Sequence, residues 1–462
     1  MRSLRGESVN FFCRCIEILF QLWGNDRMKL FKMGLAALCL GAALSTVRAE
    51  EADRLSVLES KYDALVREFE TLKNGKEGAV HKPVFGLAPA ASKVYHLKEG
   101  VTLGGYGEMV YQNFEARKDN GTASGKTDQL DFLRYVLYVG YRFSDKFLIN
   151  SEVEIEHAAE DKRGEVSVEM VNVDYLHSPA LNFRAGLLLL PVGFLNELHE
   201  PPIYHGTLRP NVERNIIPTT WRENGFGVFG QAGPLSYRAY LVNGLQALKD
   251  TALGGTTDKV KGFSASSGFR DGRQKGSSAL AEDMALVGRL DYTGVPGLLV
   301  GGSCYTGPSG QNAVVGGEKL DARTTLWETH GEWNRSGWEL RALYSRATLD
   351  DADRVNAAQG LAGNNSIGEA LWGAYGQVAF NVLSRTEARA SLSPFVRYER
   401  YNTQARVPSG FSANPANDRT EIVYGLTYKP ISTVVLKGEF IDNKNRAGTG
   451  VDQWNAAMGY LF

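Results

Sequence analysis

Cysteine is scarce in this sequence. Of its four cysteines, Cys13, Cys15 and Cys39 precede residue 50, and only Cys304 follows it. A chain cut after residue 49 therefore has no intrachain disulfide to stabilise it. The sequence also has no paired-cysteine motif, no phosphate-binding P-loop and no nucleophile elbow. It therefore shows no recognisable signature of the enzyme classes that depend on those motifs.

Long apolar runs are missing as well. A transmembrane helix needs about 20 consecutive apolar residues, and no stretch of the sequence approaches that length. The run Gly34–Leu44 follows a basic stretch and precedes Val47-Arg48-Ala49. This arrangement predicts a secretory signal peptide that is cleaved after the alanine. Residues 1–27 lie upstream of it and are predicted to be an extension, so we exclude residues 1–49 from the fold.

Positive charge is not in excess. The predicted cleavage removes seven of the 51 basic residues and three of the 52 acidic ones, which leaves 44 against 49 and a net charge of −5. That balance argues against a nucleic-acid partner. A length of 462 residues would ordinarily suggest several soluble domains, but a large β-barrel is one domain whatever its length.

Residues 50–73 carry a heptad pattern. Apolar residues spaced by three and four positions are flanked by charges, and they are Leu55, Leu58, Tyr62, Leu65, Phe69 and Leu72. The pattern predicts a short parallel coiled coil, and a single amphipathic helix packed on a domain is the alternative. Residues 74–100 contain several glycines and prolines and no sustained period, which predicts a linker before the domain formed by residues 101–462.

Apolar and polar side chains alternate throughout residues 101–462. In the last segment, Trp454 and Phe462 share one parity and Gln453 and Asn455 share the other, as on a strand with one face in lipid and the other in water. A strand of a soluble β-sandwich shows the same alternation, so this segment alone favours a membrane barrel only weakly. Many of the predicted strands match the 9 to 11 residues needed to cross a bilayer at a tilt. The sixteen predicted strands are Val101–Phe114, Asp128–Phe143, Phe147–His157, Glu165–His177, Leu181–Gly193, Gly225–Gln231, Leu235–Leu245, Asp283–Tyr292, Leu298–Thr306, Asp321–Asn334, Trp338–Leu349, Glu369–Val382, Glu387–Asn402, Arg419–Lys429, Thr433–Asp442 and Val451–Phe462.

The connections between these strands alternate in length. Short joints such as Ala232-Gly233-Pro234 and Arg335-Ser336-Gly337 alternate with long polar segments such as Phe194–Asn224 and Gln246–Glu282. Outer-membrane barrels have this rhythm, with short periplasmic turns and long external loops. An even number of antiparallel strands is also what closure of such a barrel requires. We therefore predict an all-β fold, a sixteen-stranded antiparallel transmembrane β-barrel preceded by the coiled-coil helix.

Charged residues keep to one parity of each strand. In Phe147–His157, Ile149 and Val153 oppose Glu152 and Glu154. A charge on the lipid face would cost about 2–4 kcal/mol near the bilayer midplane, so the charged parity is predicted to line a water-filled interior. The segment Glu165–His177 departs from this rule because its polarity switches faces near Val171, and a bulge or a subunit contact would explain the switch.

The central region resembles a known family. The runs His199-Glu200-Pro201-Pro202, Arg209–Arg214 and Pro218–Gly225 are similar to those of the phosphate-selective porin O and P family. The resemblance covers about residues 104–462, and the terminal Phe462 looks like the assembly signal of outer-membrane proteins. It implies a trimeric sixteen-stranded porin with a long loop folded into the lumen. Here the candidate for that constriction is the segment 194–224.

Members of that family use arginines and lysines to pass anions. The arginines predicted to face the pore are Arg209, Arg214 and Arg222 in the loop and Arg134, Arg142, Arg184, Arg238, Arg289, Arg341 and Arg397 on the wall. Fixed guanidinium groups at a narrow point favour anions because they replace lost hydration. The alternative for each wall arginine is a salt bridge that holds the loop in place. Acidic residues are predicted to face inward too, which would give the transverse field of a general porin: Glu108, Glu152, Glu154, Glu156, Glu328, Glu332, Glu399 and Glu439.

Two function classes follow from this pattern. The first is a trimeric porin for passive diffusion of small polar or anionic solutes, with no cofactor, located in outer-membrane lipid with its coiled coil in the periplasm. The second is an outer-membrane barrel enzyme of the lipase or protease type, for which Ser303, Ser309 and His330 are available but form no recognisable arrangement. His199 and His205 lack a carboxylate-rich cluster at metal spacing in the sequence, so no metal site is predicted. We predict the porin, without enzymatic activity.

Overall fold

The computed structural model describes residues 83–158 and 164–462 of the chain. The predicted signal peptide, the predicted coiled coil and residues 74–82 of the predicted linker lie outside these residues. Among the described residues, no helix is long and apolar enough to cross a membrane.

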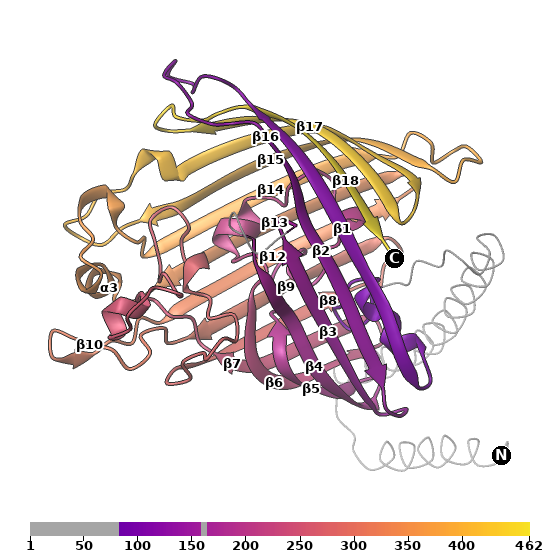
Figure 1. Cartoon of the computed structure of the whole chain (residues 1–462), viewed down its shortest axis with the longest axis horizontal. Coiled ribbons are helices and arrows are strands. Elements are labelled where there is room, and N and C mark those ends of the chain that lie inside the picture. Colours follow the sequence, from indigo (N-terminus) through magenta and orange to yellow (C-terminus); the bar gives the residue numbers. More distant parts are fainter. Residues whose placement is uncertain (1–82, 159–163) are drawn as a thin grey trace, which may run out of the picture. The chain divides into compact units, whose positions relative to one another are not determined.

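Sixteen antiparallel strands form one closed barrel (Figure 1). The predicted all-β, sixteen-stranded antiparallel barrel and its strands are confirmed, with ends that shift by a few residues, whereas the predicted coiled-coil helix lies outside the described residues. The barrel strands are β1 (Gly100–Phe114), β2 (Gln129–Arg142), β3 (Phe147–Glu156), β4 (Val166–Ser178), β5 (Leu181–Leu189), β6 (Arg222–Ala232), β7 (Leu235–Asn243), β8 (Met284–Tyr292), β9 (Leu298–Gly307), β12 (Thr324–Arg335), β13 (Trp338–Leu349), β14 (Ala370–Phe380), β15 (Ser391–Arg406), β16 (Asp418–Ile431), β17 (Val434–Asn445) and β18 (Gln453–Leu461).

The barrel closes where its first strand meets its last. β1 pairs with β18 in antiparallel register, with Tyr106 opposite Leu461 and Phe114 opposite Gln453. The backbone N–H of Phe462 donates to the carbonyl of Gly105, and the N–H of Gly105 donates to the carbonyl of Phe462, each at 3.0 Å. Closure leaves the sheet without a free edge, so every strand has a partner on both sides.

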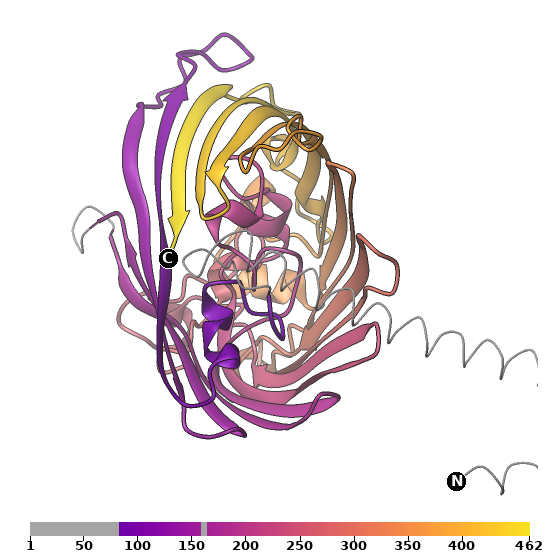
Figure 2. The ribbon, with the colours of Figure 1, turned by 90° about the vertical axis from the view of Figure 1, so that its right-hand side faces the viewer.

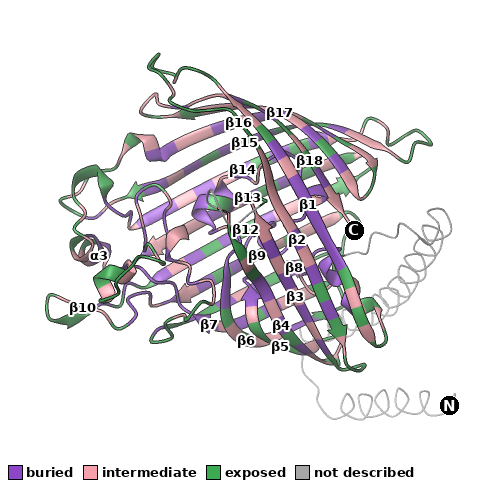
Figure 3. Ribbon diagram, in the orientation of Figure 1, coloured by how far each residue is buried: buried purple, intermediate pink, exposed green. Residues whose placement is uncertain are grey.

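Buried and less buried residues alternate along the strands of the wall (Figure 3), as the predicted alternation of side chains between its two faces requires. Leu130, Val139 and Trp454 point outward and are exposed, whereas Val136 and Asn455 point inward and are buried. The outer face is therefore rich in exposed apolar side chains, which is the pattern of a barrel that faces hydrocarbon.

β4 contains the bulge that its irregular polarity suggested. Its register with β3 shifts between Glu152 and Val153, so that Met170 and Val168 become the partners of adjacent β3 residues. Glu169 is the extra residue, and both Glu169 and Met170 are buried on the inner side. A bulge re-aims side chains in this way because two residues oppose one on the neighbouring strand.

Short turns join the strands at one end of the barrel and long loops at the other. Residues 233–234 and 336–337 form two of the short turns, and residues 190–221 and 244–283 form the two longest loops. The loops carry the remaining elements: η2 (Pro201–Ile203), η3 (Val212–Ile216), η4 (Asp250–Leu253), η5 (Arg270–Gly272), β10 (Val314–Val315), β11 (Glu318–Lys319), α3 (Ala352–Ala358), η6 (Gly363–Asn365) and η7 (Pro415–Asn417).

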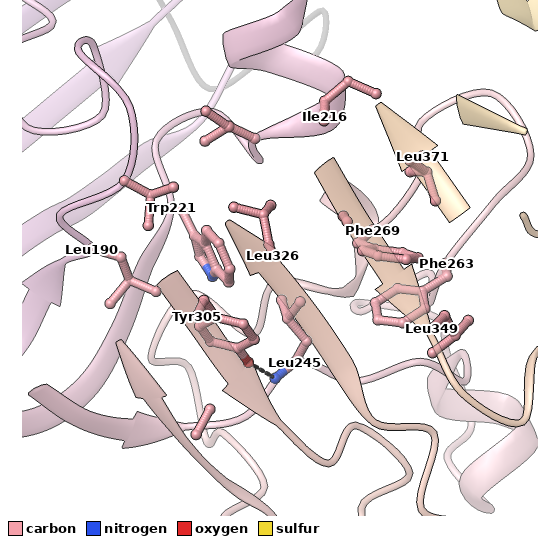
Figure 4. Close-up of a cluster of buried hydrophobic side chains, with 14 of the residues drawn as sticks. Leu190, Ile216, Trp221, Leu245, Phe263, Phe269, Tyr305, Leu326, Leu349 and Leu371 are labelled. Atoms are coloured by element: carbon pink, nitrogen blue, oxygen red, sulfur yellow. Dashed lines mark hydrogen bonds between the residues drawn. The ribbon is translucent and has the colours of Figure 1, made fainter. Parts of the chain in front are cut away.

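Part of the interior is filled by an apolar core (Figure 4). Residues of both long loops, among them Trp221 and Phe263, pack against inward side chains of the wall such as Tyr305 and Leu326. The hydroxyl of Tyr305 accepts a hydrogen bond from the backbone N–H of Leu245 at 2.9 Å. The prediction of a water-filled interior is therefore wrong for the part of the barrel that holds this core, because the two long loops bury apolar residues there.

Residues 83–99, which precede β1, also lie inside the barrel (Figure 2). Their short helix η1 (Ala91–His96) packs at the short-turn end. The carbonyl of Ala91 accepts from Asn150 Nδ2 at 2.8 Å, and the hydroxyl of Tyr95 donates to Asp174 at 2.5 Å. The described part of the predicted linker is therefore held against the inner wall.

Candidate functional site

The loop of residues 190–221 crosses the interior of the barrel. It contacts strands on opposite sides of the wall: Tyr204 donates to Glu108 of β1 at 3.3 Å, and the backbone N–H of Gly193 donates to Glu328 of β12 at 3.4 Å. These carboxylates accept hydrogen bonds from the loop because the backbone N–H groups and side-chain hydroxyls that the loop brings into the interior need partners. The loop is therefore fixed to the wall from both sides.

A cavity of about 390 Å³ lies between this loop and the strands β1 to β4. Its strand side is acidic and is lined by Glu108, Asp131, Glu154, Glu156, Glu165 and Glu169. Its other side is basic and is lined by Arg209 and Arg214 of this loop, by Arg222 of β6, and by Arg270, Arg273 and Lys275 of the second long loop. An adjoining cavity of about 780 Å³ shares four of these cations and adds Lys259 and Lys261. Charges of opposite sign therefore face each other across the solvent-filled space.

Four arginines of the basic side have no ion pair among the described residues. They are Arg209, Arg214, Arg270 and Arg273. Nη1 of Arg209 donates to the hydroxyls of Thr219 at 2.9 Å and Thr220 at 3.0 Å, but its Nε and Nη2 have no partner, and neither does Nε of Arg270. Burial, followed by repulsion from Arg270 and Arg222, lowers the pKa of Arg273 to about 10. The positive charge of these four arginines is available to a solute, because no carboxylate of the described residues forms an ion pair with them.

The predicted wall arginines are paired instead. The nearest pairs are Arg134–Glu108 at 2.7 Å, Arg184–Asp174 at 2.9 Å, Arg238–Asp291 at 3.0 Å, Arg289–Asp291 at 2.8 Å and Arg341–Glu332 at 2.5 Å. The predicted loop residue Arg222, which begins β6, pairs with Glu169 at 2.7 Å. Arg397 lies 3.9 Å from Glu399. These placements favour the salt-bridge alternative for the wall arginines.

Arg142 lies away from the cavity. Its guanidinium donates to the backbone carbonyls of Tyr95 at 2.9 Å, Asp145 at 3.0 Å and Ser144 at 3.2 Å. It thus joins the first short turn to the segment before β1. Of the predicted pore residues, the structure leaves Arg209 and Arg214 as the two that line the cavity without a carboxylate partner.

The loop also separates the cavity from two smaller spaces near the short-turn end. Tyr204 lines the 390 Å³ cavity, Ile203 lines a space of about 290 Å³, and His205 lines a space of about 360 Å³. Because these residues are consecutive, residues 203–205 form the partition between the spaces. The predicted constriction segment 194–224 contains this partition.

Sequence reasoning missed Arg270 and Arg273. They belong to the second long loop, where no period of two or 3.6 indicates which way a side chain points. The signal available was the cluster of Lys259, Lys261, Arg270, Arg273 and Lys275 within one loop. This basic cluster faces the cavity only because the apolar residues Phe263 and Phe269 anchor the loop in the interior core.

The residues considered for a barrel enzyme do not form a nucleophile and base. Ser303 donates to Glu328 at 2.7 Å, and His330 also contacts Glu328, at 2.8 Å. Ser309 pairs with Thr324 at 2.9 Å. An activated serine requires a hydrogen bond to its base, and here serine and histidine share a carboxylate instead.

His199 has carboxylate neighbours that its sequence context did not reveal. Glu152 of β3 and Glu169 of β4 each offer an oxygen, and these atoms and a His199 ring nitrogen all lie within 4.8 Å of one another. The three residues are far apart in the sequence and meet because the loop folds against the inner face of β3 and β4. The expectation that no carboxylates surround His199 at metal spacing is therefore wrong.

Comparison with known proteins gives one relative and a set of similar barrels. The chain is 36% identical over 394 residues to an uncharacterized protein of Aquifex aeolicus, covering 83% of this chain and 84% of that protein. No family model matches the sequence, so membership of the phosphate-selective porin family stays a prediction. The porin OmpF of Salmonella typhi, solved with daunomycin, has a TM-score of 0.51 at 10% identity over 78% of this chain and 97% of its own. An anion-selective porin from Comamonas acidovorans has a TM-score of 0.49 at 12% identity over 79% of this chain and 100% of its own. The likeness to OmpF shows that the chain has the fold of an outer-membrane porin.

Proposed function

Because the chain belongs to the same family as the Aquifex aeolicus protein and has a porin fold, we propose that it forms a water-filled channel in an outer membrane. Small polar solutes would cross it by passive diffusion, with no cofactor. The observation that carries this proposal is the charged cavity inside a closed barrel whose outer face is apolar. A channel of this kind needs only the solute gradient to drive transport.

We expect the channel to prefer anions. Arg209, Arg214, Arg270 and Arg273 border the cavity without carboxylate partners, whereas the acidic residues Glu108 and Glu169 on the opposite side are each paired with an arginine. Unpaired guanidinium groups attract an anion and replace part of its hydration at the narrow point. The remaining acidic residues weaken this preference, so we propose selectivity rather than strict exclusion of cations.

The proposal also includes the orientation of the barrel in the membrane and its assembly into a trimer. Long loops face outward and short turns face the periplasm in barrels of this type, which would place the segment before β1 and the predicted coiled coil on the periplasmic side. A trimer would be consistent with the heptad pattern of residues 50–73 and with the resemblance to phosphate-selective porins. The predicted narrowing by the segment 194–224 is supported by the partition at residues 203–205.

Planar-bilayer recording tests the proposal. The purified chain should produce stepwise conductance, and its reversal potential in a KCl gradient should indicate anion preference. Replacing Arg209, Arg214, Arg270 and Arg273 by glutamine should move the reversal potential toward cation selectivity, because the acidic wall remains. The matched control is Arg446→Gln, since Arg446 is an exposed arginine of an external loop, 3.6 Å from Asp418. Absence of channels would overturn the proposed function, and an unchanged reversal potential in the quadruple variant would overturn the anion preference alone.

A further inference from the structure

The buried group of His199, Glu152 and Glu169 has the geometry of a metal site. Nε2 of His199 lies 2.9 Å from Oε1 of Glu152 and 3.9 Å from Oε2 of Glu169. The relative exposures of the three residues are 1%, 0% and 2%. Ligand atoms around a tetrahedral Zn²⁺ at about 2.0–2.2 Å are separated by roughly 3.3–3.5 Å. The two separations from His199 therefore need to change by about 0.4–0.6 Å, and the two carboxylate oxygens lie within 4.8 Å of each other.

The hydrogen bond on the other ring nitrogen fixes the role of His199. Nδ1 lies 3.0 Å from the backbone carbonyl of Asn196. A carbonyl can only accept, so Nδ1 carries a proton, and in a neutral imidazole the lone pair is then on Nε2. Nε2 lies 2.9 Å from Oε1 of Glu152, and a bound metal ion would replace this hydrogen bond, because a ligating histidine must be neutral. Histidine ligands of metals are oriented by the same Nδ1–H to carbonyl contact.

The two carboxylates have oxygens without partners. Oε2 of Glu152 and Oε2 of Glu169 are buried and receive no hydrogen bond from a nitrogen or hydroxyl donor of the described residues, although the Glu169 carboxyl lies beside that of Glu154. Arg222 binds the other oxygen of Glu169 at 2.7 Å, which leaves Oε2 free to ligate. The bulge in β4 turns Glu169 toward His199. A buried acceptor without a partner costs about 1–3 kcal/mol, and more when it is charged, so both oxygens call for a ligand.

The carboxylates around this site outnumber the cations that pair with them. Among the described residues, the ion pairs of this region are Arg134 with Glu108 and Glu154, and Arg222 with Glu169. Glu152 has no lysine or arginine partner there, and its ionic contact is with His199. A buried carboxylate is retained when it is paired or coordinates a metal. A cation at the centre of the group would supply the missing charge.

We propose that His199, Glu152 and Glu169 bind a divalent transition-metal ion, with Zn²⁺ preferred over Mn²⁺. One imidazole and two carboxylates suit Zn²⁺, and affinity rises from Mn²⁺ to Zn²⁺ at sites of this kind. The ion reaches the site from the lumen, because Glu169 also lines the 390 Å³ cavity. Bound there, it links the loop to β3 and β4 and fixes the loop on the acidic side of the cavity. Glu154 lies beside Glu169, but its Oε1 pairs with Nη1 of Arg134 at 3.2 Å, so we do not count it among the ligands.

Metal binding to the full-length chain in detergent micelles tests this site. The protein is stripped with EDTA and titrated with Zn²⁺ alone, against a chromophoric chelator, and bound metal is counted by mass spectrometry. A single high-affinity equivalent is expected. Glu169→Gln and His199→Gln should lower the affinity by at least the roughly 10- to 100-fold that even outer-shell changes cause. The matched control is His157→Gln, because His157 also pairs with a carboxylate, Asp131 at 2.6 Å, and should leave affinity unchanged.

Spectroscopy keeps the proposal testable if a variant does not fold. X-ray absorption at the zinc edge of the wild-type protein should show one imidazole and an oxygen-rich shell at about 2.0–2.2 Å. The proposal is overturned if the wild-type protein takes up no stoichiometric Zn²⁺, or if the spectrum contains no imidazole. Unchanged affinity in folded Glu169→Gln and His199→Gln proteins would also overturn it.

Discussion

Asn196 ties the two ends of the loop of residues 190–221 together through Trp221. Oδ1 of Asn196 accepts a hydrogen bond from the backbone N–H of Trp221 at 2.6 Å. Its Nδ2 donates to the carbonyls of Trp221 at 2.9 Å and Leu190 at 2.7 Å. One buried amide thus satisfies three backbone groups where the chain leaves β5 and returns to β6. The loop can cross the lumen because its base is closed in this way.

The first prediction concerns this closure. Asn196→Ala should lower the free energy of unfolding by about 1–3 kcal/mol, because it leaves the buried backbone N–H of Trp221 without a partner. The carbonyls of Leu190 and Trp221 keep the backbone donors Val192 and Leu190. Urea unfolding followed by tryptophan fluorescence measures the loss. Asn334→Ala is the control, since Asn334 is exposed and makes one side-chain bond, to Glu332 at 2.6 Å. Equal stability of the two variants would contradict the assignment of Asn196.

The second prediction separates cavity arginines from wall arginines. Arg273→Gln should reduce anion preference in a salt gradient, because Arg273 lines the cavity without a carboxylate partner. Arg142→Gln should leave the reversal potential unchanged, because Arg142 binds backbone carbonyls at the short-turn end. Both substitutions remove one positive charge, so net charge cannot explain a difference. Equal shifts in the two variants would refute the distinction.

The sixteen strands were predictable because their signal is local. A side-chain period of two and short turns such as 233–234 mark each strand from its own residues. Even the β4 bulge left a trace, because adding Glu169 to the strand reverses the parity of every residue after it. Partners of the arginines were not predictable in the same way. Whether Arg184 meets Asp174 depends on strand register, and Arg270 depends on where an aperiodic loop is anchored.

The interior core was hidden from sequence reasoning for a related reason. Phe263 and Phe269 lie in a loop rich in glycine, serine and charge, which reads as an external connection. They are buried only because the loop returns into the barrel and packs beside Leu371 and Leu349 of the wall. The contact pairs residues about 100 positions apart, and no local period encodes it.

The third prediction concerns pH and Glu213. Burial raises the pKa of the Glu213 carboxyl above its ordinary value of 4.5, although hydrogen bonds from Tyr375 and Leu195 oppose the shift. The folded state then holds this proton more tightly than the unfolded state, so the contribution to stability is complete below the ordinary pKa. This contribution to stability is lost as the pH rises through the raised pKa that Glu213 has in the folded protein. Thermal unfolding midpoints should therefore fall across this range in the wild-type protein and fall less in Glu213→Gln. Parallel pH curves for the two proteins would contradict the shift.

The last prediction concerns the heptad segment, residues 50–73. If it forms a coiled coil between copies, deleting it should lower trimer yield or trimer stability, because the apolar seam would no longer join the chains. Single-pore conductance should be unchanged, since the cavity and its arginines belong to residues 108–275. Native electrophoresis measures the first effect and bilayer recording the second. A control variant replaces residues 74–79 by a flexible Gly-Ser linker of equal length and should still form trimers. Loss of pore activity in correctly folded trimers would show that the segment acts on the channel itself.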